Sequence, residues 1–259
     1  MEDQKGYRKI PLSFNRKMVK ASASITRQKN AIHAVTEVDV TEPRRLIREH
    51  FEKTGEKLSF TAYIVTCLSQ TLMDHPGLNS FIRRGKLVLL DDITVSVLVE
   101  RDLEGERVPE PYIVRESQKK SYKEISSELR GAQGIRSDKL GSLTGSTWIN
   151  IIPGFLLRLF VRIADRNIKM AKLYGKLGVT AVGMFGKDAL WFIPHGTATV
   201  LVTVGSIVDK PVRTENGFTF KEHLCLTVSF DHDIVDGAPA TRFMKQFTET
   251  VRDGSIIGQ

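Results

Sequence analysis

The sequence lacks the features that mark a secreted or membrane-spanning protein. It contains two cysteines in 259 residues, which is too few for a disulfide framework. It opens with charged residues instead of the apolar run of a signal peptide. No uninterrupted apolar stretch reaches the roughly 18–20 residues needed to cross a bilayer. We therefore expect a cytoplasmic protein in which Cys67 and Cys225 are buried thiols.

An excess of basic residues limits the kinds of partner. Lys and Arg number 38 against 30 Asp and Glu, which gives a net charge of +8. Such a charge suits nucleic acid, an anionic membrane surface or a phosphate-rich ligand such as coenzyme A. The basic residues are scattered, and no cluster of them is interleaved with aromatic residues that could stack on bases. We therefore expect no nucleic-acid partner.

The pattern of apolar residues predicts one large α/β domain. Hydrophobic residues make up 41% of the chain, which suffices for a substantial core. Their spacing predicts helices at 16–24, 41–54, 59–73, 117–130 and 242–251, strands at 30–40, 87–90, 93–99, 178–186, 189–193, 197–208 and 223–230, and loops at 100–111 and 131–146. This order predicts a two-layer α/β sandwich in which helices flank a mixed β-sheet.

Residues 226–244, LTVSFDHDIVDGAPATRFM, place a strand, a tight loop and a helix start around His232. Apolar residues alternate with polar ones up to Phe230, as in a strand with one buried face. Asp236 and Gly237 supply turn chemistry, and Pro239 suits the first turn of a helix. A histidine on this short loop, beside three carboxylates, could be a general base, a metal ligand or a polar loop residue.

The spacing of the neighbouring residues argues against a metal. The three acidic residues of the loop resemble the start of a calcium loop, but the third is one position late and Arg242 stands where the closing Glu is needed. Zinc would require a second ligand close by, whereas His223 and Cys225 lie on or before the preceding strand with no repeat of the pattern. We therefore expect no metal and interpret His232 as a general base, because imidazole titrates near neutrality.

The string SFDHDIVDGAPATRFM resembles the His-x-x-x-Asp-Gly signature of the dihydrolipoamide acyltransferases of 2-oxoacid dehydrogenase complexes, whose catalytic domain is related to chloramphenicol acetyltransferase. Three earlier segments resemble further parts of this family in the expected order: VTEVDVT at 35–41, HPGLNS at 75–80 and SYKEISSEL at 121–129. The resemblance implies a chloramphenicol acetyltransferase-like domain at 16–259 behind an N-terminal arm at 1–15.

The resemblance implies an acyltransferase that moves an acyl group between coenzyme A, as a substrate, and an acceptor that the sequence does not identify. In this family the histidine takes the proton of a coenzyme A or dihydrolipoyl thiol, and the sulfur attacks a thioester carbonyl. His232 would be that base. Asp236 would orient the loop through an ion pair, with Arg16 as the best-placed partner, although a purely structural Asp236 fits equally well. A homotrimer with active sites between subunits is also implied.

The sequence departs from the family pattern at its oxyanion-binding strand. Residues 178–186 resemble the Gly-x-x-x-Ile-Ser-x-x-Gly strand, but Gly183 stands at the position of the serine. Losing one oxyanion donor typically costs about two to three decades in rate. A backbone amide, Thr180 or a residue elsewhere must substitute, or activity is weak. No lipoyl domain, and hence no bound lipoate, is recognisable, so we expect a stand-alone acyltransferase, with a non-catalytic binding or assembly module as the alternative.

Residues 148–174 form an apolar and basic segment that looks inserted relative to the family pattern. We predict a helix that packs on its own protein or on another copy of the chain, with an apolar face that lines an acyl pocket or covers the entrance of the active site. This face consists of Ile151, Ile152, Phe155, Leu156, Leu159, Phe160 and Ile163. Contact of the same face with an anionic membrane surface is the less favoured alternative.

Overall fold

The computed structural model describes residues 7–12, 14–103, 106–134, 153–182, 188–215 and 217–258. In this part of the chain, a six-stranded sheet has the order β1-β8-β7-β6-β4-β5. Its strands are β1 (Ala31–Asp39), β4 (Val95–Leu103), β5 (Glu106–Val114), β6 (Leu177–Ala181), β7 (Val200–Thr214) and β8 (Gly217–Asp231). Strand β6 runs parallel to β4 and β7, and the other neighbours are antiparallel. The predicted mixed sheet is confirmed.

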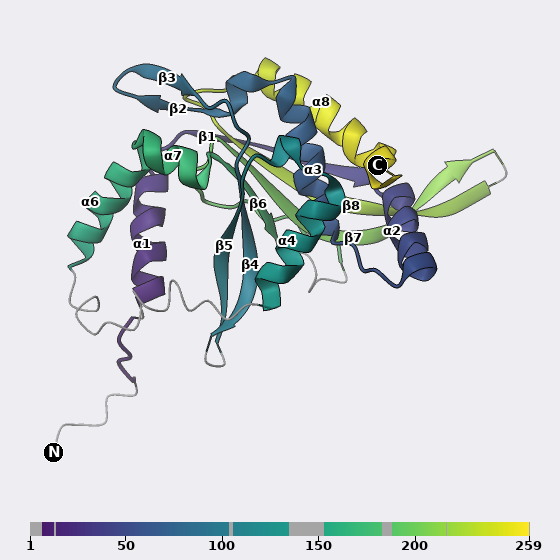
Figure 1. Cartoon of the computed structure of the whole chain (residues 1–259), viewed down its shortest axis with the longest axis horizontal. Coiled ribbons are helices and arrows are strands. Elements are labelled where there is room, and N and C mark those ends of the chain that lie inside the picture. Colours follow the sequence, from purple (N-terminus) through teal and green to yellow (C-terminus); the bar gives the residue numbers. More distant parts are fainter. Residues whose placement is uncertain are drawn as a thin grey trace.

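A layer of helices covers one face of this sheet (Figure 1). It consists of α2 (Thr41–Thr54), α3 (Phe60–Met73), α4 (Tyr122–Gly134) and α8 (Gly237–Asp253). Helix α3 is apolar on nearly every side and is therefore buried at the centre of the layer. Phe230 near the end of β8 meets Phe243 of α8 edge to face, with ring centroids 5.7 Å apart. Both ends of the loop that carries His232 are thus anchored in the core.

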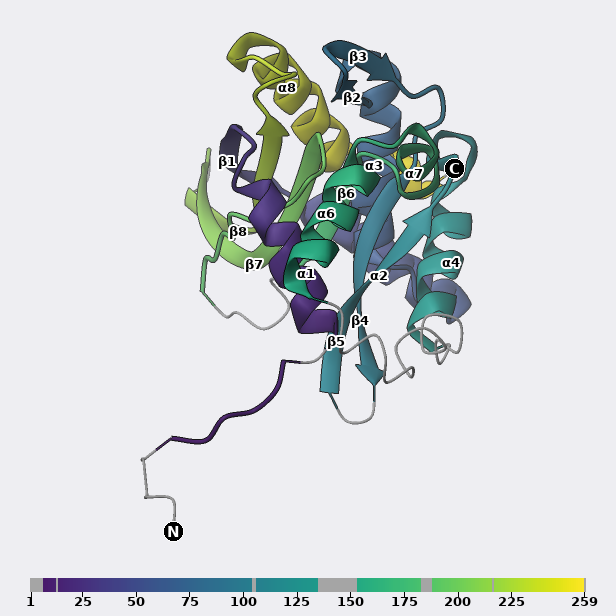
Figure 2. The same ribbon diagram turned by 90° about the vertical axis from the view of Figure 1, so that its left-hand side faces the viewer.

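A second group of helices lies beside the end of the sheet where β8 finishes. It contains α1 (Phe14–Thr26), α6 (Gly154–Asp165) and α7 (Ile168–Tyr174). Helices α1 and α6 pack side by side, as two perpendicular views show (Figures 1 and 2). A small hairpin of β2 (Ser80–Arg83) and β3 (Lys86–Leu89), and short 3-10 helices at Pro76–Leu78, Ser117–Lys119 and Ser255–Gly258, complete the described elements. None of the described helices combines the length and apolarity that a membrane span requires.

The prediction of a loop at 100–111 is wrong, because most of these residues belong to the β4–β5 hairpin. Pro109 and Pro111 suggested a loop, yet both lie on β5, paired with Glu100 and Leu98. Strand β5 is the last in the sheet order, and an edge strand tolerates proline because one side of it needs no N–H donor. Of the loop predicted at 131–146, residues 131–134 belong to α4, and the rest lies outside the described residues.

The prediction of a strand at 189–193 is also wrong. This segment crosses β7 where the β7–β8 register shifts between Val204 and Ile207. Leu190 N donates to Ser206 Oγ at 2.8 Å, and Ser206 N donates to the Leu190 carbonyl at 3.3 Å. A Cβ atom at Gly205 would lie 2.2 Å from that carbonyl oxygen, so glycine is needed for the close approach. The segment therefore contacts the sheet without extending it.

Asp39 connects the end of β1 to the start of α2 and to β8. Its carboxylate accepts hydrogen bonds from Lys221 Nζ at 2.7 Å and from the Thr41 backbone N at 3.0 Å. Burial alone would raise the pKa of Asp39, but these hydrogen bonds outweigh it and lower the pKa to about 2, from an ordinary value of 3.8. The charged carboxylate therefore stabilises the folded state.

We expect Asp39→Asn to lower the free energy of unfolding at pH 7 by about 2 kcal/mol, because one pKa unit corresponds to about 1.4 kcal/mol. Since the folded-state pKa is depressed, this contribution is present above pH 3.8 and is lost as the pH falls toward 2. Urea unfolding at pH 7 and pH 3 measures it, and the difference should roughly halve at the lower pH. Asp209→Asn, at an exposed carboxylate on β7, is the control. A difference independent of pH would contradict the expectation.

Candidate active site

His232 lies directly after β8, in a loop held by backbone hydrogen bonds. Its own N–H donates to the Asn30 carbonyl at 2.6 Å, next to β1. Within the loop, the N–H groups of Ile234 and Val235 both donate to the Asp231 carbonyl at 3.0 Å. The predicted strand, tight loop and helix are therefore found as expected, with α8 beginning at Gly237.

The imidazole of His232 is oriented by a backbone carbonyl. Its Nδ1 lies 3.0 Å from the Val235 carbonyl oxygen. A carbonyl oxygen can only accept a hydrogen bond, so Nδ1 carries the proton of the neutral ring and Nε2 keeps an unshared electron pair. The side chain is 43% exposed, which leaves the ring accessible to a reactant. These are the properties that a general base requires.

Asp236 lies near His232 but does not hold the loop as predicted. Its Oδ1 is 3.8 Å from His232 Nδ1, which is too far for a hydrogen bond. It stands at the N-cap position of α8 without making a side-chain cap. The ion pair that the structure gives Asp236 is this long one, and its side chain is 87% exposed, so the predicted pairing with Arg16 is not observed.

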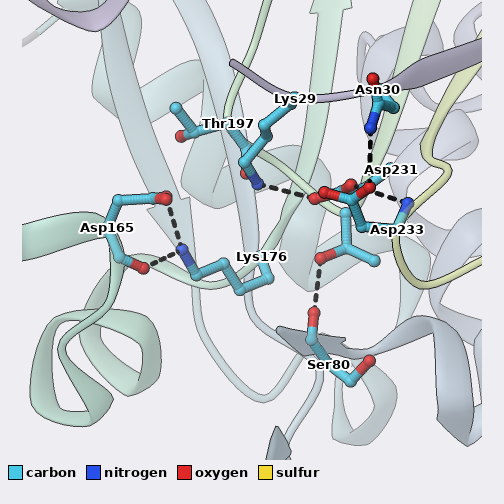
Figure 3. Close-up of polar contacts among 9 residues, drawn as sticks. Lys29, Asn30, Ser80, Asp165, Lys176, Thr197, Asp231 and Asp233 are labelled. Atoms are coloured by element: carbon cyan, nitrogen blue, oxygen red, sulfur yellow. Dashed lines mark hydrogen bonds and ion pairs between the residues drawn. The ribbon is translucent and has the colours of Figure 1, made fainter. Parts of the chain in front are cut away.

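A buried ion pair supports the loop from inside the protein. Lys29 Nζ donates to Asp231 Oδ2 at 2.8 Å and to the Thr197 carbonyl at 2.7 Å (Figure 3). Asp231 is 6% exposed, and its Oδ1 also accepts the backbone N–H of Asp233 at 3.3 Å. The sequence showed Asp231 only as one of three loop carboxylates. Its partner was detectable in principle, because Lys29 precedes the β1 residue that pairs with Asp231.

A second buried ion pair lies beside the first (Figure 3). Lys176 Nζ donates to Asp165 Oδ1 at 2.7 Å, and it stands 5.1 Å from the centre of the Phe81 ring as a cation–π contact. Burial lowers the pKa of Lys176, and the nearby Asp165 carboxylate opposes this effect. The pair attaches the end of α6 to the segment that enters β6.

The two ion pairs line a pocket of about 140 Å³ next to the loop. Its lining consists of Ile25, Gln28, Lys29, Phe81, Ile82, Arg162, Asp165, Arg166, Lys176, Asp231 and Asp233. Asp231 and Asp233 flank His232 in the sequence, so the pocket and the imidazole share one loop. Helix α6 therefore borders this region, as predicted for residues 148–174. It does so through the charged side chains of Arg162 and Asp165 and not through its apolar face.

The predicted apolar lining of an acyl pocket is not observed. The residues in question are 44–61% exposed: Phe155, Leu156, Leu159, Phe160 and Ile163. Ile151 and Ile152 lie outside the described residues. The residue that α6 buries is Leu157. Within one chain the wider apolar face turns outward, so its packing on the same chain is not observed, and its packing on another copy stays a prediction.

The oxyanion-binding strand is described in part. Gly183 lies outside the described residues, so its predicted role stays a prediction. Thr180 lies on β6 level with Thr203 of β7, which is level with Thr227 of β8. Thr227 precedes His232 by five residues, or roughly 16 Å along the chain. Thr180 and His232 of one chain are therefore too far apart to act on the same carbonyl.

The described residues offer no metal centre or reactive thiol. No group of three or more His, Cys, Asp or Glu side chains in this part of the chain is placed to hold a metal ion. Cys67 and Cys225 are free and buried, as predicted. Burial raises the pKa of the Cys67 thiol, which stays protonated and unreactive.

Sequence relatives of the chain are acyltransferase components. It is 28% identical over 97% of its length to the lipoamide acyltransferase component of the branched-chain alpha-keto acid dehydrogenase complex of Bacillus subtilis, covering 54% of that protein. It is 25% identical over 91% of its length to the dihydrolipoyllysine-residue acetyltransferase component of the acetoin cleaving system of the same organism, covering 53% of it. The chain thus spans about half the length of the curated relatives it matches.

Solved structures share the fold. A probable dihydrolipoamide acetyltransferase from Listeria monocytogenes superposes with a TM-score of 0.69 at 22% identity, covering 95% of this chain and 94% of that one. The cubic core of the pyruvate dehydrogenase multienzyme complex gives a TM-score of 0.72 at 17% identity, covering 98% and 94%. At these identities the likeness shows the fold alone.

A family model for the catalytic domain of the 2-oxoacid dehydrogenases acyltransferase matches residues 4–148 and 156–256. The unmatched residues 149–155 lie within the segment predicted to be an insertion, and the model covers the remainder of that segment. The match takes in both the strand and the loop that position His232, together with nearly all of the described fold. The chain therefore belongs to the family of 2-oxoacid dehydrogenase acyltransferase catalytic domains.

Proposed function

We propose that the protein moves an acyl group between coenzyme A and an acceptor, with His232 as the general base. Membership of the acyltransferase family supports the reaction type. The main support for this role of His232 is the 3.0 Å contact between its Nδ1 and the Val235 carbonyl oxygen. This contact leaves Nε2 of the accessible ring unprotonated. Relatives named for lipoamide and dihydrolipoyllysine favour a thiol as the acceptor.

The chemistry needs one proton transfer in each direction. His232 Nε2 takes the proton of the attacking thiol, and the sulfur adds to the thioester carbonyl carbon. The tetrahedral intermediate collapses, the carbon–sulfur bond to the original thiol breaks, and the leaving thiolate recovers the proton from the imidazolium. A thiol with an ordinary pKa near 8.5 and an ordinary imidazole near 6.5 differ by about two units, or roughly 2.7 kcal/mol, which is small enough for a base acting during attack.

A non-catalytic binding or assembly module is the competing proposal, favoured by glycine at position 183 where the family has its oxyanion serine. Acyl transfer from acyl-coenzyme A, measured with thiol, amine and hydroxyl acceptors, separates the two. The enzyme proposal requires turnover with at least one acceptor and its loss in His232→Ala. If both proteins are folded and equally inert with every acceptor, the module proposal stands instead.

We further propose a homotrimer whose active sites lie between subunits. Within one chain, β6 runs away from the end of the sheet that carries His232, and Thr180 lies near the far end of β6. A second copy can supply the oxyanion donor that the first cannot bring near its own histidine. One structural neighbour is the cubic core of a multienzyme complex, which is consistent with assembly.

Light scattering at micromolar concentration tests the assembly. The expected particle has three times the chain mass of 29.1 kDa and keeps this mass on tenfold dilution. A uniform monomer that still transfers acyl groups would overturn the shared site. A uniform monomer without activity would likewise contradict the proposed trimer.

A further inference from the structure

Helix α6 presents a broad apolar face to solvent. It buries Leu157, and its last residue, Asp165, pairs with Lys176. Five large apolar residues remain exposed by 44–61%: Phe155, Leu156, Leu159, Phe160 and Ile163. A large apolar side chain has on the order of 200 Å² of surface, so these half-exposed residues offer roughly 500 Å². This area is more than half of the roughly 800 Å² that each partner buries in a standard protein–protein interface.

A second exposed apolar patch lies on residues 188–194, which we call the 188–194 segment. Four consecutive side chains of this segment are exposed by 36–56%: Leu190, Trp191, Phe192 and Ile193. The segment is nevertheless attached to two strands of the sheet. The Leu190 carbonyl lies against Gly205 of β7, and Trp191 Nε1 donates to the Thr36 carbonyl of β1 at 3.1 Å. Its backbone is therefore held in place while its apolar side chains remain partly in solvent.

The 188–194 segment lies on the face of the sheet that the helix layer does not cover. Val202 of β7 belongs to the core under the helices, and side chains alternate between the two faces along a strand. Thr203 and the Cβ position of Gly205 therefore point to the other face, where the Leu190 carbonyl lies. Thr180 of β6 pairs with Thr203 and shares its face. The segment and the oxyanion-binding strand thus offer side chains on the same face of the sheet.

A three-fold assembly requires two different contact surfaces on each copy. In a cyclic trimer, every contact joins one surface of a copy to a different surface of the next. The proposed trimer brings the His232 end of one copy to the oxyanion-binding strand of its neighbour. Helix α6 borders the pocket beside the His232 loop, and the 188–194 segment lies on the same face as Thr180. A contact that completes the active site therefore brings the two apolar patches toward each other.

The charges around the two patches favour this contact over a two-fold one. Arg158, Arg162 and Arg166 are exposed at intervals of four on one flank of α6, and a two-fold contact of α6 with itself would bring these arginines together. The 188–194 segment instead contains the exposed Asp188 and no basic residue. In the part of the chain that the structure describes, Arg162, Arg166 and Asp188 have no ion-pair partner.

We propose that the apolar face of α6 docks on the 188–194 segment of the neighbouring copy in a cyclic trimer. Phe155 and Phe160 pack against the apolar side chains of that segment, and the arginines of α6 lie toward Asp188 of the neighbouring copy. The contact covers the pocket beside the His232 loop and holds the neighbour's oxyanion-binding strand close to this loop. The inference rests on the proposed trimer and adds which two surfaces meet in it.

Cross-linking of the full chain tests which surfaces meet. Phe160→Cys combined with Ile193→Cys, treated with a short bismaleimide, should give a covalent trimer, because each copy then offers one thiol to each of its two neighbours. Each single variant should stay unlinked. The wild type should not react, since Cys67 and Cys225 are buried.

Phe160→Cys combined with Phe218→Cys is the matched control. Phe218 is 75% exposed and lies on the β7–β8 hairpin, which is at the opposite end of the molecule from α6 (Figure 1). This variant should give no covalent trimer. An active trimer in which Phe160→Cys with Ile193→Cys is not linked between chains overturns the docking and leaves the proposed function standing. Covalent dimers of Phe160→Cys alone would reveal a two-fold contact and also overturn it, whereas a monomeric wild type overturns both the docking and the trimer.

Removing the apolar face should weaken the trimer. Phe155→Ser with Phe160→Ser is expected to raise its dissociation constant by about tenfold or more per ring, because assembly removes both rings from water. Phe218→Ser with Phe220→Ser, at two phenylalanines that are 75% and 70% exposed, should leave the particle mass unchanged on dilution. If the α6 variant keeps the mass of the wild type but loses binding to vesicles of phosphatidylglycerol and phosphatidylcholine, a bilayer covers the face and the proposal is overturned.

Discussion

Replacing His232 by alanine is expected to lower the rate of acyl transfer by about 10²- to 10⁴-fold, which is the usual contribution of a positioned general base. The loss should appear in kcat, because the imidazole acts as the thiol proton moves in the transition state. The fold should persist, since the side chain is 43% exposed and its contact is with a backbone carbonyl that water can satisfy. Initial rates with a thiol acceptor over a range of acyl-coenzyme A concentrations measure the effect.

His223→Ala is the control for this prediction. His223 lies on the same strand, β8, and its Nδ1 contacts the Lys221 carbonyl at 3.1 Å, outside the loop that carries His232. Its replacement removes an imidazole from β8 without touching the proposed reaction centre. Equal rate losses in the two variants would show that the effect comes from the strand and not from a base at position 232.

The loop around His232 was predictable because local chemistry specifies it. Alternation up to Phe230, the Asp236-Gly237 turn and Pro239 in the first helical turn each favour the same conformation without distant contacts. The mixed sheet followed from the order of helices and strands. What orients the imidazole was not predictable, because the partner is the Val235 carbonyl and every residue has one.

The two buried ion pairs were missed for a different reason. Lys29 and Asp231, and likewise Lys176 and Asp165, meet through strand pairing and helix placement, which a charge pattern along the chain does not reveal. From the sequence alone, the simplest expectation for a lysine is that its side chain is exposed to solvent. The one available signal was the antiparallel pairing of β1 with β8, which places Lys29 near the end of β8.

The orientation of α6 shows the limit of reasoning from amphipathicity. The periodicity correctly indicated a helix with a wide apolar face and a basic flank. Periodicity alone does not state which face the protein covers, and the usual rule places the apolar one inside. Here Leu157 and the Asp165–Lys176 pair fix the inner side, so the wider face of Phe155 and its neighbours is left outside.

Asp231→Asn is expected to destabilise the protein by about 3–5 kcal/mol, because it leaves the ammonium of Lys29 buried without its counter-charge. Lys29 and Asp231 are 18% and 6% exposed, so water replaces the lost partner only in part. Lys29→Met combined with Asp231→Asn should recover part of this loss, since no unpaired charge then remains inside. Urea unfolding of the wild type, both single variants and the double variant gives the coupling free energy of the pair.

The double variant should still have a lower kcat, by about 10- to 100-fold, because a small displacement of a catalytic group is costly. Asp231 Oδ1 accepts the N–H of Asp233, and Asp231 begins the loop whose Val235 carbonyl orients the imidazole. Lys29 and Asp231 are thus positioning residues for His232. Asp39→Asn provides the comparison, since it also destabilises β1 but at the end paired with His223, away from the loop. If kcat fell equally in that variant, loss of stability alone would explain the effect, and the positioning role would be refuted.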